Sequence, residues 1–155
     1  MISPEVLRRF PFFANVTDDQ LKTLAMIAEE QNLKKGEEIF KEGESAQDLY
    51  ILTDGSFDLF LKSEESFAPT SKREFAVGEI NQGEIFGISS LIEPYTFNVT
   101  ARSSTDCTFI AFEGSALKAY MEKDPQFSCF LMTQAAKLLL ERLYWTRVQL
   151  AAAWA

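Results

Sequence analysis

Residues 49–61, Leu-Tyr-Ile-Leu-Thr-Asp-Gly-Ser-Phe-Asp-Leu-Phe-Leu, carry the strongest structural signal in the sequence. Two runs rich in aliphatic and aromatic residues, 49–52 and 57–61, lie on either side of Asp54-Gly55. Strand-forming runs separated by an Asp-Gly pair are typical of a β-hairpin. We therefore expect two strands joined by a hairpin turn at Asp54-Gly55.

Short runs of the same kind continue on both sides of this stretch. They are Glu38-Ile39-Phe40, Glu74-Phe75-Ala76-Val77, Val99-Thr100-Ala101 and Cys107-Thr108-Phe109-Ile110-Ala111-Phe112. Glycines interrupt the runs at Gly36, Gly43, Gly78, Gly83 and Gly87. Many short strands with close turns predict a mainly β fold over residues 36–113, either a barrel or a double-sheet roll.

Two further features belong to this β-rich part. The motif Gly36-Glu37-Glu38-Ile39-Phe40 returns as Gly83-Glu84-Ile85-Phe86, which indicates a short internal repeat. Residues 62–73 are polar and rich in serine, and we expect them to form one long surface loop between two strands.

The first 35 residues have a helical signature. Thr17 and Gln20 have the spacing of a capping box, and Leu21, Leu24, Ala25 and Ala28 follow on one helical face. This pattern predicts a short amphipathic helix that ends near Asn32. An apolar cluster around Pro11 precedes it, and we expect that cluster to pack under the β-structure rather than to form a binding surface. Its members are Val6, Leu7, Phe10, Phe12, Phe13 and Val16.

Residues 115–155 are predicted to be helical. Ser115 is placed to cap a short helix that runs through Met121. Asp124 followed by Pro125 is typical of a helix N-cap with proline at the first helical position, which predicts a second helix toward Ala155. At 1.5 Å per residue this helix reaches about 45 Å, too long for so small a domain to cover.

The long helix carries a coiled-coil pattern. Apolar and small residues recur at intervals of three and four at Ala136, Leu139, Leu143, Thr146, Leu150 and Ala153, while Phe127, Leu131 and Leu138 are placed to face the domain. The six residues from Ala136 to Ala153 form the predicted seam of the helix. This seam predicts pairing of two copies across a two-fold axis. The alternative is that the helix folds back as additional core. Trp145 and Trp154 fit either a partner contact or packing within the chain.

Composition excludes several classes of function. The chain has 155 residues, is 46% hydrophobic and 25% charged, and has a formal net charge of −8, which fits one soluble domain and argues against direct nucleic-acid binding. Histidine is absent, which excludes His-ligated metal or haem and imidazole-based catalysis. No apolar stretch is long enough for a membrane span or has the form of a signal peptide, so we expect a cytoplasmic protein with no membrane partner.

The acidic residues and cysteines suggest no cofactor. Glu37, Glu38, Glu42, Glu44 and Asp48 lack the ordered spacing of a calcium loop, so a solvated acidic turn is the better interpretation and no metal is assigned. Cys107 and Cys129 have no basic neighbours to activate a thiolate, and we expect both to be core residues. No nucleophile lies beside a base, which predicts a protein that is not an enzyme.

The motifs taken together resemble the cyclic-nucleotide-binding domain of bacterial cyclic-AMP receptor regulators and kinase regulatory subunits. The resemblance rests on residues 36–44, 49–52 with Asp54-Gly55, 83–87, Leu91, Pro94, 99–101, 115–121 and Asp124-Pro125. It implies a jelly-roll β-roll with flanking helices, a single domain over 1–155, and a last helix that forms a dimer interface. The helical segments are 1–35 and 115–155, and the roll is 36–113. The helix-turn-helix of the bacterial regulators has no counterpart in this sequence.

The resemblance also implies a ligand site after the Phe-Gly pair. In the family, helix amides and an arginine hold the cyclic phosphate and a glutamate holds the ribose. Here Ile88 stands in place of the glutamate and Tyr95 in place of the arginine, and the stretch from Gly87 to Pro94 is about two residues shorter. The candidate ligand-binding residues are Phe86, Gly87, Ser89, Ser90, Tyr95, Thr96 and Asn98.

Two functions follow from this sequence. The first is a non-enzymatic sensory or regulatory domain that binds a cyclic nucleotide or another small effector in the roll, with weak affinity for cyclic AMP. The second is a degenerate module that binds no nucleotide and acts by dimerisation or protein association.

Overall fold

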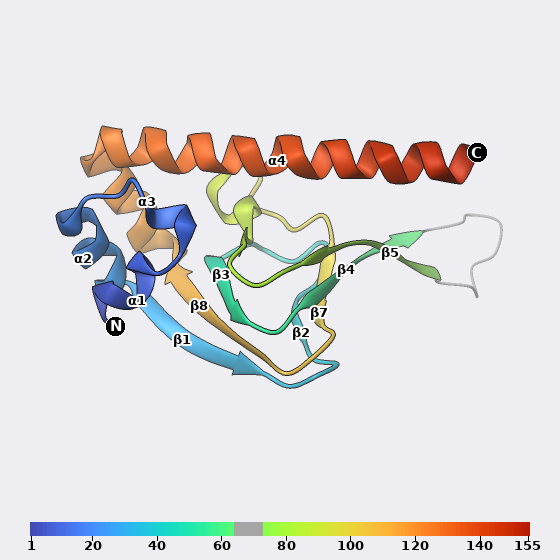
Figure 1. Cartoon of the computed structure of the whole chain (residues 1–155), viewed down its shortest axis with the longest axis horizontal. Helices are drawn as coiled ribbons and strands as arrows, with labels where there is room; N and C mark the ends of the chain where they lie inside the picture. Colours follow the sequence, from blue (N-terminus) through green and yellow to red (C-terminus); the bar gives the residue numbers. More distant parts are fainter. Residues whose placement is uncertain (64–72) are drawn as a thin grey trace. The chain divides into compact units, whose positions relative to one another are not determined.

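A computed structural model describes residues 1–63 and 73–155. Residues Met1–Lys118 form one compact unit and Ala119–Ala155 form a second. The first unit has the mainly β architecture that the sequence predicts (Figure 1).

Within the described residues, the strands of the first unit form two antiparallel sheets of four strands each. The first sheet has the order β1 (Ala28–Leu33), β8 (Cys107–Glu113), β3 (Asp48–Asp54) and β6 (Ile85–Phe86). The second has the order β2 (Glu38–Phe40), β7 (Thr100–Ser103), β4 (Phe57–Ser63) and β5 (Arg73–Ile80). The ends of the predicted surface loop 62–73 therefore belong to strands β4 and β5, and residues 64–72 lie outside the described residues.

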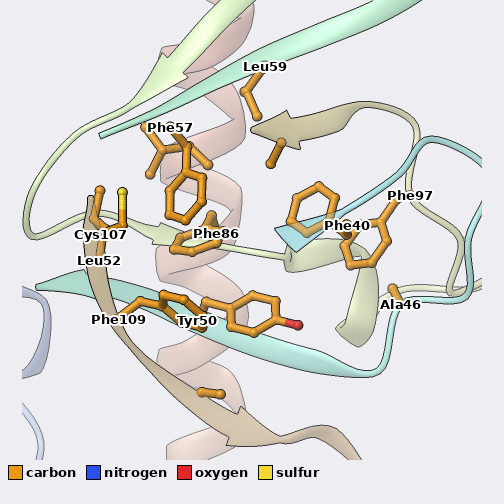
Figure 2. Packing of buried hydrophobic residues seen from close by; sticks show 13 residues of the cluster. Phe40, Ala46, Tyr50, Leu52, Phe57, Leu59, Phe86, Phe97, Cys107 and Phe109 are labelled. Atoms are coloured by element: carbon orange, nitrogen blue, oxygen red, sulfur yellow. The ribbon is translucent and has the colours of Figure 1, made fainter. Parts of the chain in front are cut away.

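The core of the roll lies between the two sheets. Alternate residues of one strand face it, as Tyr50 and Leu52 do in β3 and Phe109 does in β8 (Figure 2). Ile110 and Phe112, which lie between the core-facing residues of β8, are also buried, and the ring of Phe112 lies 6.0 Å from that of Phe13 in the N-terminal segment, measured between centroids. Because both faces of the sheet are covered around the middle of β3 and the end of β8, residues 49–52 and 109–112 are continuously apolar in the sequence.

The turn at Asp54-Gly55 is present, but the predicted hairpin is wrong. Strand β3 pairs with β6 and β8, whereas β4 pairs with β5 and β7, so the turn connects the two sheets. An Asp-Gly pair encodes a sharp reversal of the backbone but does not specify which strands then pair. Long-range pairing with β8 and β7 decides that instead.

The repeated motif forms the same turn twice. The amide of Glu37 donates to Lys34 O and that of Glu84 to Asn81 O, both at 3.1 Å. The glycine before each glutamate has a positive φ, 89° at Gly36 and 87° at Gly83, which favours glycine there. Each turn leads into an edge strand, β2 of one sheet or β6 of the other.

The N-terminal segment comprises α1 (Pro4–Arg8), the 3₁₀ turn η1 (Pro11–Phe13) and α2 (Asp18–Met26). The capping box of Thr17 and Gln20 is confirmed, with both reciprocal hydrogen bonds present. Packing of the Pro11 cluster under the β-structure is confirmed by Phe13. The predicted helix end near Asn32 is wrong, because Ala28 onward forms β1 along the free edge of β8.

Helix α3 (Gly114–Lys123) begins one residue before the predicted cap, so Ser115 lies inside the helix. The amide of Gly114 donates instead to Asp48 Oδ1 at 3.2 Å. A Cβ at Gly114 would collide with the carbonyl oxygen of Gln47, which explains the glycine. A residue distant in the sequence therefore supplies the acceptor that was expected from Ser115.

Helix α4 spans Pro125–Trp154, and its predicted N-cap is confirmed: Asp124 Oδ1 accepts from the amide of Phe127 at 3.0 Å. Phe127 and Leu131 are buried and Leu138 is half-buried. None of the described helices combines the length and the apolarity that crossing a bilayer requires.

Candidate functional site

The candidate site begins at Gly87, between β6 and the 3₁₀ turn η2 (Ile88–Leu91). Gly87 has φ 78°, and a Cβ there would lie 2.8 Å from the Tyr50 ring and 2.9 Å from Asp48 O. Only glycine fits this conformation and this close approach without distortion. The backbone after Phe86 is therefore held tightly against β3.

The serines of η2 differ in their roles. Ser90 is fully buried, and both its amide (3.0 Å) and its hydroxyl (2.7 Å) donate to Gly87 O. These donors are therefore already used within the turn. Ser89 is half-buried, and its carbonyl accepts from the amide of Ile92 at 3.4 Å.

The second part of the candidate site is the loop that leads to β7. Tyr95 is half-buried with φ 56°, and Lys118 Nζ lies 3.8 Å from the centroid of its ring. This cation–π contact fastens the loop to α3. Thr96 and Asn98 are exposed, and Thr96 forms an isolated β-bridge with Ser45.

Residues 40–50 bring the two parts together. Gly87 approaches Asp48 and Tyr50, while Ala46 donates its amide to Tyr95 O at 2.7 Å. The fold therefore places both parts of the predicted site along one segment. Whether these residues bind a ligand remains a prediction.

Aromatic rings fill the interior of the roll beside this segment (Figure 2). Phe40 and Phe97 stack with centroids 3.8 Å apart and planes 5° apart, and Phe97 is only 5% exposed. Tyr50 stacks on Phe86 at 5.0 Å. Burial, with a smaller effect from Asp48, raises the pKa of Tyr50 to about 12, so this side chain is neutral at physiological pH.

Phe40 and Lys118 are the side chains that the sequence analysis did not connect with the site. Phe97 lies between the candidate residues Thr96 and Asn98, but nothing in the local sequence distinguishes a buried ring at this position from an exposed one. Lys118 lies far along the chain from Tyr95, and only tertiary structure brings the two together.

Arg102 on β7 is engaged in a surface network. Its guanidinium contacts Glu74 at 2.9 and 3.1 Å and Glu38 at 3.3 Å, and it lies 4.5 Å from the Phe60 ring centroid. The hydrogen bond with Glu74 is the main cause of a raised pKa at Arg102 and of a lowered pKa at Glu74. The charge of Arg102 is thus compensated by two carboxylates.

The acidic cluster has structural partners. Glu37 accepts from the amide of Lys34 at 3.0 Å, and Glu44 from that of Lys41 at 3.3 Å. The other three carboxylates also accept hydrogen bonds: Glu38 from Arg102, Glu42 from the amide of Lys62, and Asp48 from that of Gly114. Among residues 1–63 and 73–155, no group of three metal-ligating side chains converges.

The two cysteines lie in different environments. Cys107 is 3% exposed on β8, as expected for a core residue. The prediction for Cys129 is wrong, because its side chain is exposed on α4. Its position in the helix gave no sequence signal that separates a covered face from an open one.

The predicted seam of α4 is open to solvent. Leu139, Leu143 and Leu150 are 47%, 44% and 58% exposed, so they are not core residues of this chain. The other seam positions, Ala136, Thr146 and Ala153, are exposed as well. Trp145 and Trp154 are 56% and 83% exposed.

Comparisons with curated proteins place these features in a known group. A CRP-like cAMP-activated global transcriptional regulator of Mycobacterium tuberculosis is 23% identical over 95% of this chain. A protein of Rhodopseudomonas palustris described as a potassium channel protein is 19% identical over 83% of the chain. The chain spans 61% of the first relative and 29% of the second.

Solved structures show the same fold. A cyclic nucleotide-binding protein from Geobacter metallireducens is similar with a TM-score of 0.77 and 36% identity, over 92% of this chain and 99% of that one. The N-terminal domain of a transcriptional regulator from Streptomyces coelicolor is similar with a TM-score of 0.68 and 27% identity, over 88% and 93% of the two chains.

The family model that matches the sequence covers residues 30–124, from β1 to the N-cap of α4, and its description is cyclic nucleotide-binding domain. This range contains the roll, η2 and the loop with Tyr95. The chain therefore belongs to the cyclic nucleotide-binding domain family.

Proposed function

We propose that this chain is a regulatory domain that catalyses no reaction and whose roll binds cyclic AMP weakly or not at all. One observation carries the proposal: the position where the family places its phosphate-binding arginine holds Tyr95, and the nearby ammonium of Lys118 lies against the face of that ring at 3.8 Å. The regulatory role is supported by the matched family and by the relatives that are named as transcriptional regulators.

The charge needed to hold a cyclic phosphate is poorly supplied here. An anion site combines free backbone amides with a cation, and Ser90 already directs both of its donors to Gly87 O. Ile88, in place of the family's glutamate, is 9% exposed and apolar. Arg102 is held by Glu38 and Glu74.

The space is also restricted. The stack of Phe97 on Phe40, together with that of Tyr50 on Phe86, occupies the roll interior beside Gly87. A nucleotide of the family would have to displace at least one ring from a packed position. That displacement adds a cost beyond the missing charges.

The magnitude can be estimated from the two missing anchors. A lost charge-assisted hydrogen bond costs about 1.5–3 kcal/mol, and each 1.4 kcal/mol is about tenfold in affinity. The loss of one anchor alone corresponds to about tenfold to a hundredfold, so with two anchors missing we expect cyclic AMP to bind at least that much more weakly than to a family site that retains both.

Isothermal titration of the purified chain with cyclic AMP and cyclic GMP tests the proposal. We expect weak binding or no saturable heat for both nucleotides. The double variant Ile88→Glu with Tyr95→Arg is the matched comparison. It should restore little, because the loop stays short and an arginine at position 95 would meet the like charge of Lys118. Submicromolar binding by the wild type would overturn the proposal.

A second candidate function is ligand-independent association of two copies through α4, favoured by the exposure of Leu139, Leu143 and Leu150. An apolar seam of this kind is stabilised when a second helix covers it. Light scattering at micromolar concentration should give a mass above one chain for the wild type and one chain for Leu143→Asp. A monomeric wild type would exclude this candidate.

A further inference from the structure

Tyr95 has a backbone conformation that a bulky side chain rarely adopts. Its φ is 56°, in the left-handed region that glycine and asparagine favour. Among the described residues, it is the one residue other than glycine with a positive φ. A bulky residue in this region costs free energy and persists only where its surroundings hold it there. The contacts around Tyr95 must therefore stabilise this conformation.

Backbone hydrogen bonds hold the loop that contains Tyr95 against the segment before β3. The amide of Ala46 donates to Tyr95 O at 2.7 Å, and the amide of Phe97 donates to Glu44 O at 3.0 Å. The amide of Gly43 donates to Phe97 O at 2.8 Å. All three bonds break if the loop moves away, so these amides report whether the loop is closed.

The side chains of the loop are held by two different elements of the first unit. Phe97 enters the roll and stacks on Phe40 (Figure 2). Tyr95 is held by α3, because Lys118 Nζ lies 3.8 Å from the centroid of its ring, well within cation–π distance. No carboxylate among the residues that the structure describes forms a salt bridge with Lys118, so no described acidic side chain competes with the ring for its ammonium.

The partner of residue 95 distinguishes this chain from its family. In the family, the residue at this position is the arginine that pairs with the cyclic phosphate, so that a bound ligand holds this part of the loop. In this chain the partner of Tyr95 is Lys118, a side chain of the same molecule. Closure of the loop therefore needs no ligand.

We propose that Lys118 and Tyr95 form a latch that keeps the loop of residues 92–98 closed over the roll in the absence of any ligand. In the closed loop, Phe97 stays inside the roll and the backbone bonds described above are formed. Without the latch, Tyr95 loses a contact that offsets its unfavourable φ, and the loop opens more often. The proposal rests on the proposed function, in which the roll binds cyclic AMP weakly or not at all.

Amide hydrogen exchange of the ligand-free chain, followed residue by residue by NMR, tests the latch. The amides of Ala46 and Phe97 should be protected in the wild type, because both donate to the closed loop or from it. Lys118→Met keeps the length of the side chain and removes its charge. It should speed exchange at both amides by about twofold to thirtyfold, the range to which a cation–π contact corresponds.

Three further variants separate the ring from the backbone. Tyr95→Phe keeps the face of the ring and should keep the protection. Tyr95→Asn tolerates a positive φ but has no ring, so it should speed exchange as Lys118→Met does. When it is combined with Lys118→Met, the second change should add nothing, because each removes the same contact. Lys123→Met, at an exposed position on the same helix, is the matched control and should leave exchange unchanged.

The results distinguish the closed loop, the latch and the proposed function. Unprotected amides at Ala46 and Phe97 in the ligand-free wild type would overturn the closed loop. Unchanged exchange in Lys118→Met, or additive effects of Lys118→Met and Tyr95→Asn, would overturn the latch. None of these results depends on cyclic AMP, whereas the proposed function fails if titration shows tight binding of that nucleotide.

Discussion

Replacing Phe97 by alanine tests how the roll interior is filled. Phe97 is 5% exposed and stacks on Phe40 at 3.8 Å, so the substitution removes a buried ring and its aromatic partner contact. Removing a buried phenylalanine costs about 3–5 kcal/mol when the surroundings cannot collapse. Of this loss, the aromatic pair contributes about 0.5–1.5 kcal/mol. A typical domain has a free energy of unfolding of about 5–15 kcal/mol, so a large part of the stability should be lost.

Urea unfolding followed by far-ultraviolet circular dichroism measures this loss. Tryptophan fluorescence is unsuitable, because Trp145 and Trp154 both lie on α4 in the second unit. Asn98→Ala, at an exposed position next to Phe97, is the control and should change the unfolding free energy by less than about 0.5 kcal/mol. A loss below about 1 kcal/mol in Phe97→Ala would refute the packing described here.

The same variant separates the two obstacles to nucleotide binding. Phe97→Ala opens space in the roll but supplies no charge. We expect the missing charge to be the larger obstacle. The affinity of this variant for cyclic AMP should then exceed that of the wild type by no more than about tenfold. A larger gain would show that the ring is the principal obstacle.

Three further outcomes follow from the site and the surface network. Gly87→Ala should lower the unfolding free energy by about 1–3 kcal/mol in urea, because the new Cβ meets Tyr50 at a positive φ; an unchanged midpoint would contradict this. The pKa of Glu74 is lowered in the folded chain. The contribution of this carboxylate to stability is therefore present above its ordinary pKa of 4.5 and is lost as the pH falls through the lower pKa of the folded state. Glu74→Gln should therefore show a flatter acid unfolding profile than the wild type, and identical profiles would exclude its pairing with Arg102. The pKa of Tyr50 is raised to about 12, so its contribution is present below pH 10 and is lost as pH rises toward 12. Tyrosinate absorbance should show one group titrating late, and this group should be missing in Tyr50→Phe.

The sequence was sufficient to predict local features whose donor and acceptor lie three or four positions apart. The capping box at Thr17 and the N-cap at Asp124 were predicted correctly, because donor and acceptor lie within one helical turn. The repeated motif at residues 36–40 and 83–86 marked the same glycine turn twice. Short runs rich in aliphatic and aromatic residues, separated by glycine turns, identified most strands of the roll.

Features that depend on distant partners escaped the sequence. Residues 29–32, Glu-Glu-Gln-Asn, have no apolar alternation, and they form β1 only because the edge of β8 offers hydrogen-bonding partners. The Asp54-Gly55 turn was predicted without its role as a link between the two sheets. At the candidate site, the loss of both charged anchors was readable from Ile88 and Tyr95, whereas the Phe97 stack was not.

The sequence by itself determined that this chain is a β-roll of the cyclic nucleotide-binding domain family with a long terminal helix, and that two charged anchors are replaced. These properties rest on residue identity and on spacings within a few positions. Tertiary structure alone decided that Phe97 fills the roll beside Phe40, that Lys118 covers Tyr95 and that Asp48 caps the helix at Gly114. The physical reason is that each of these contacts joins separate elements of the chain. Local propensity cannot specify such a contact before the strands have paired.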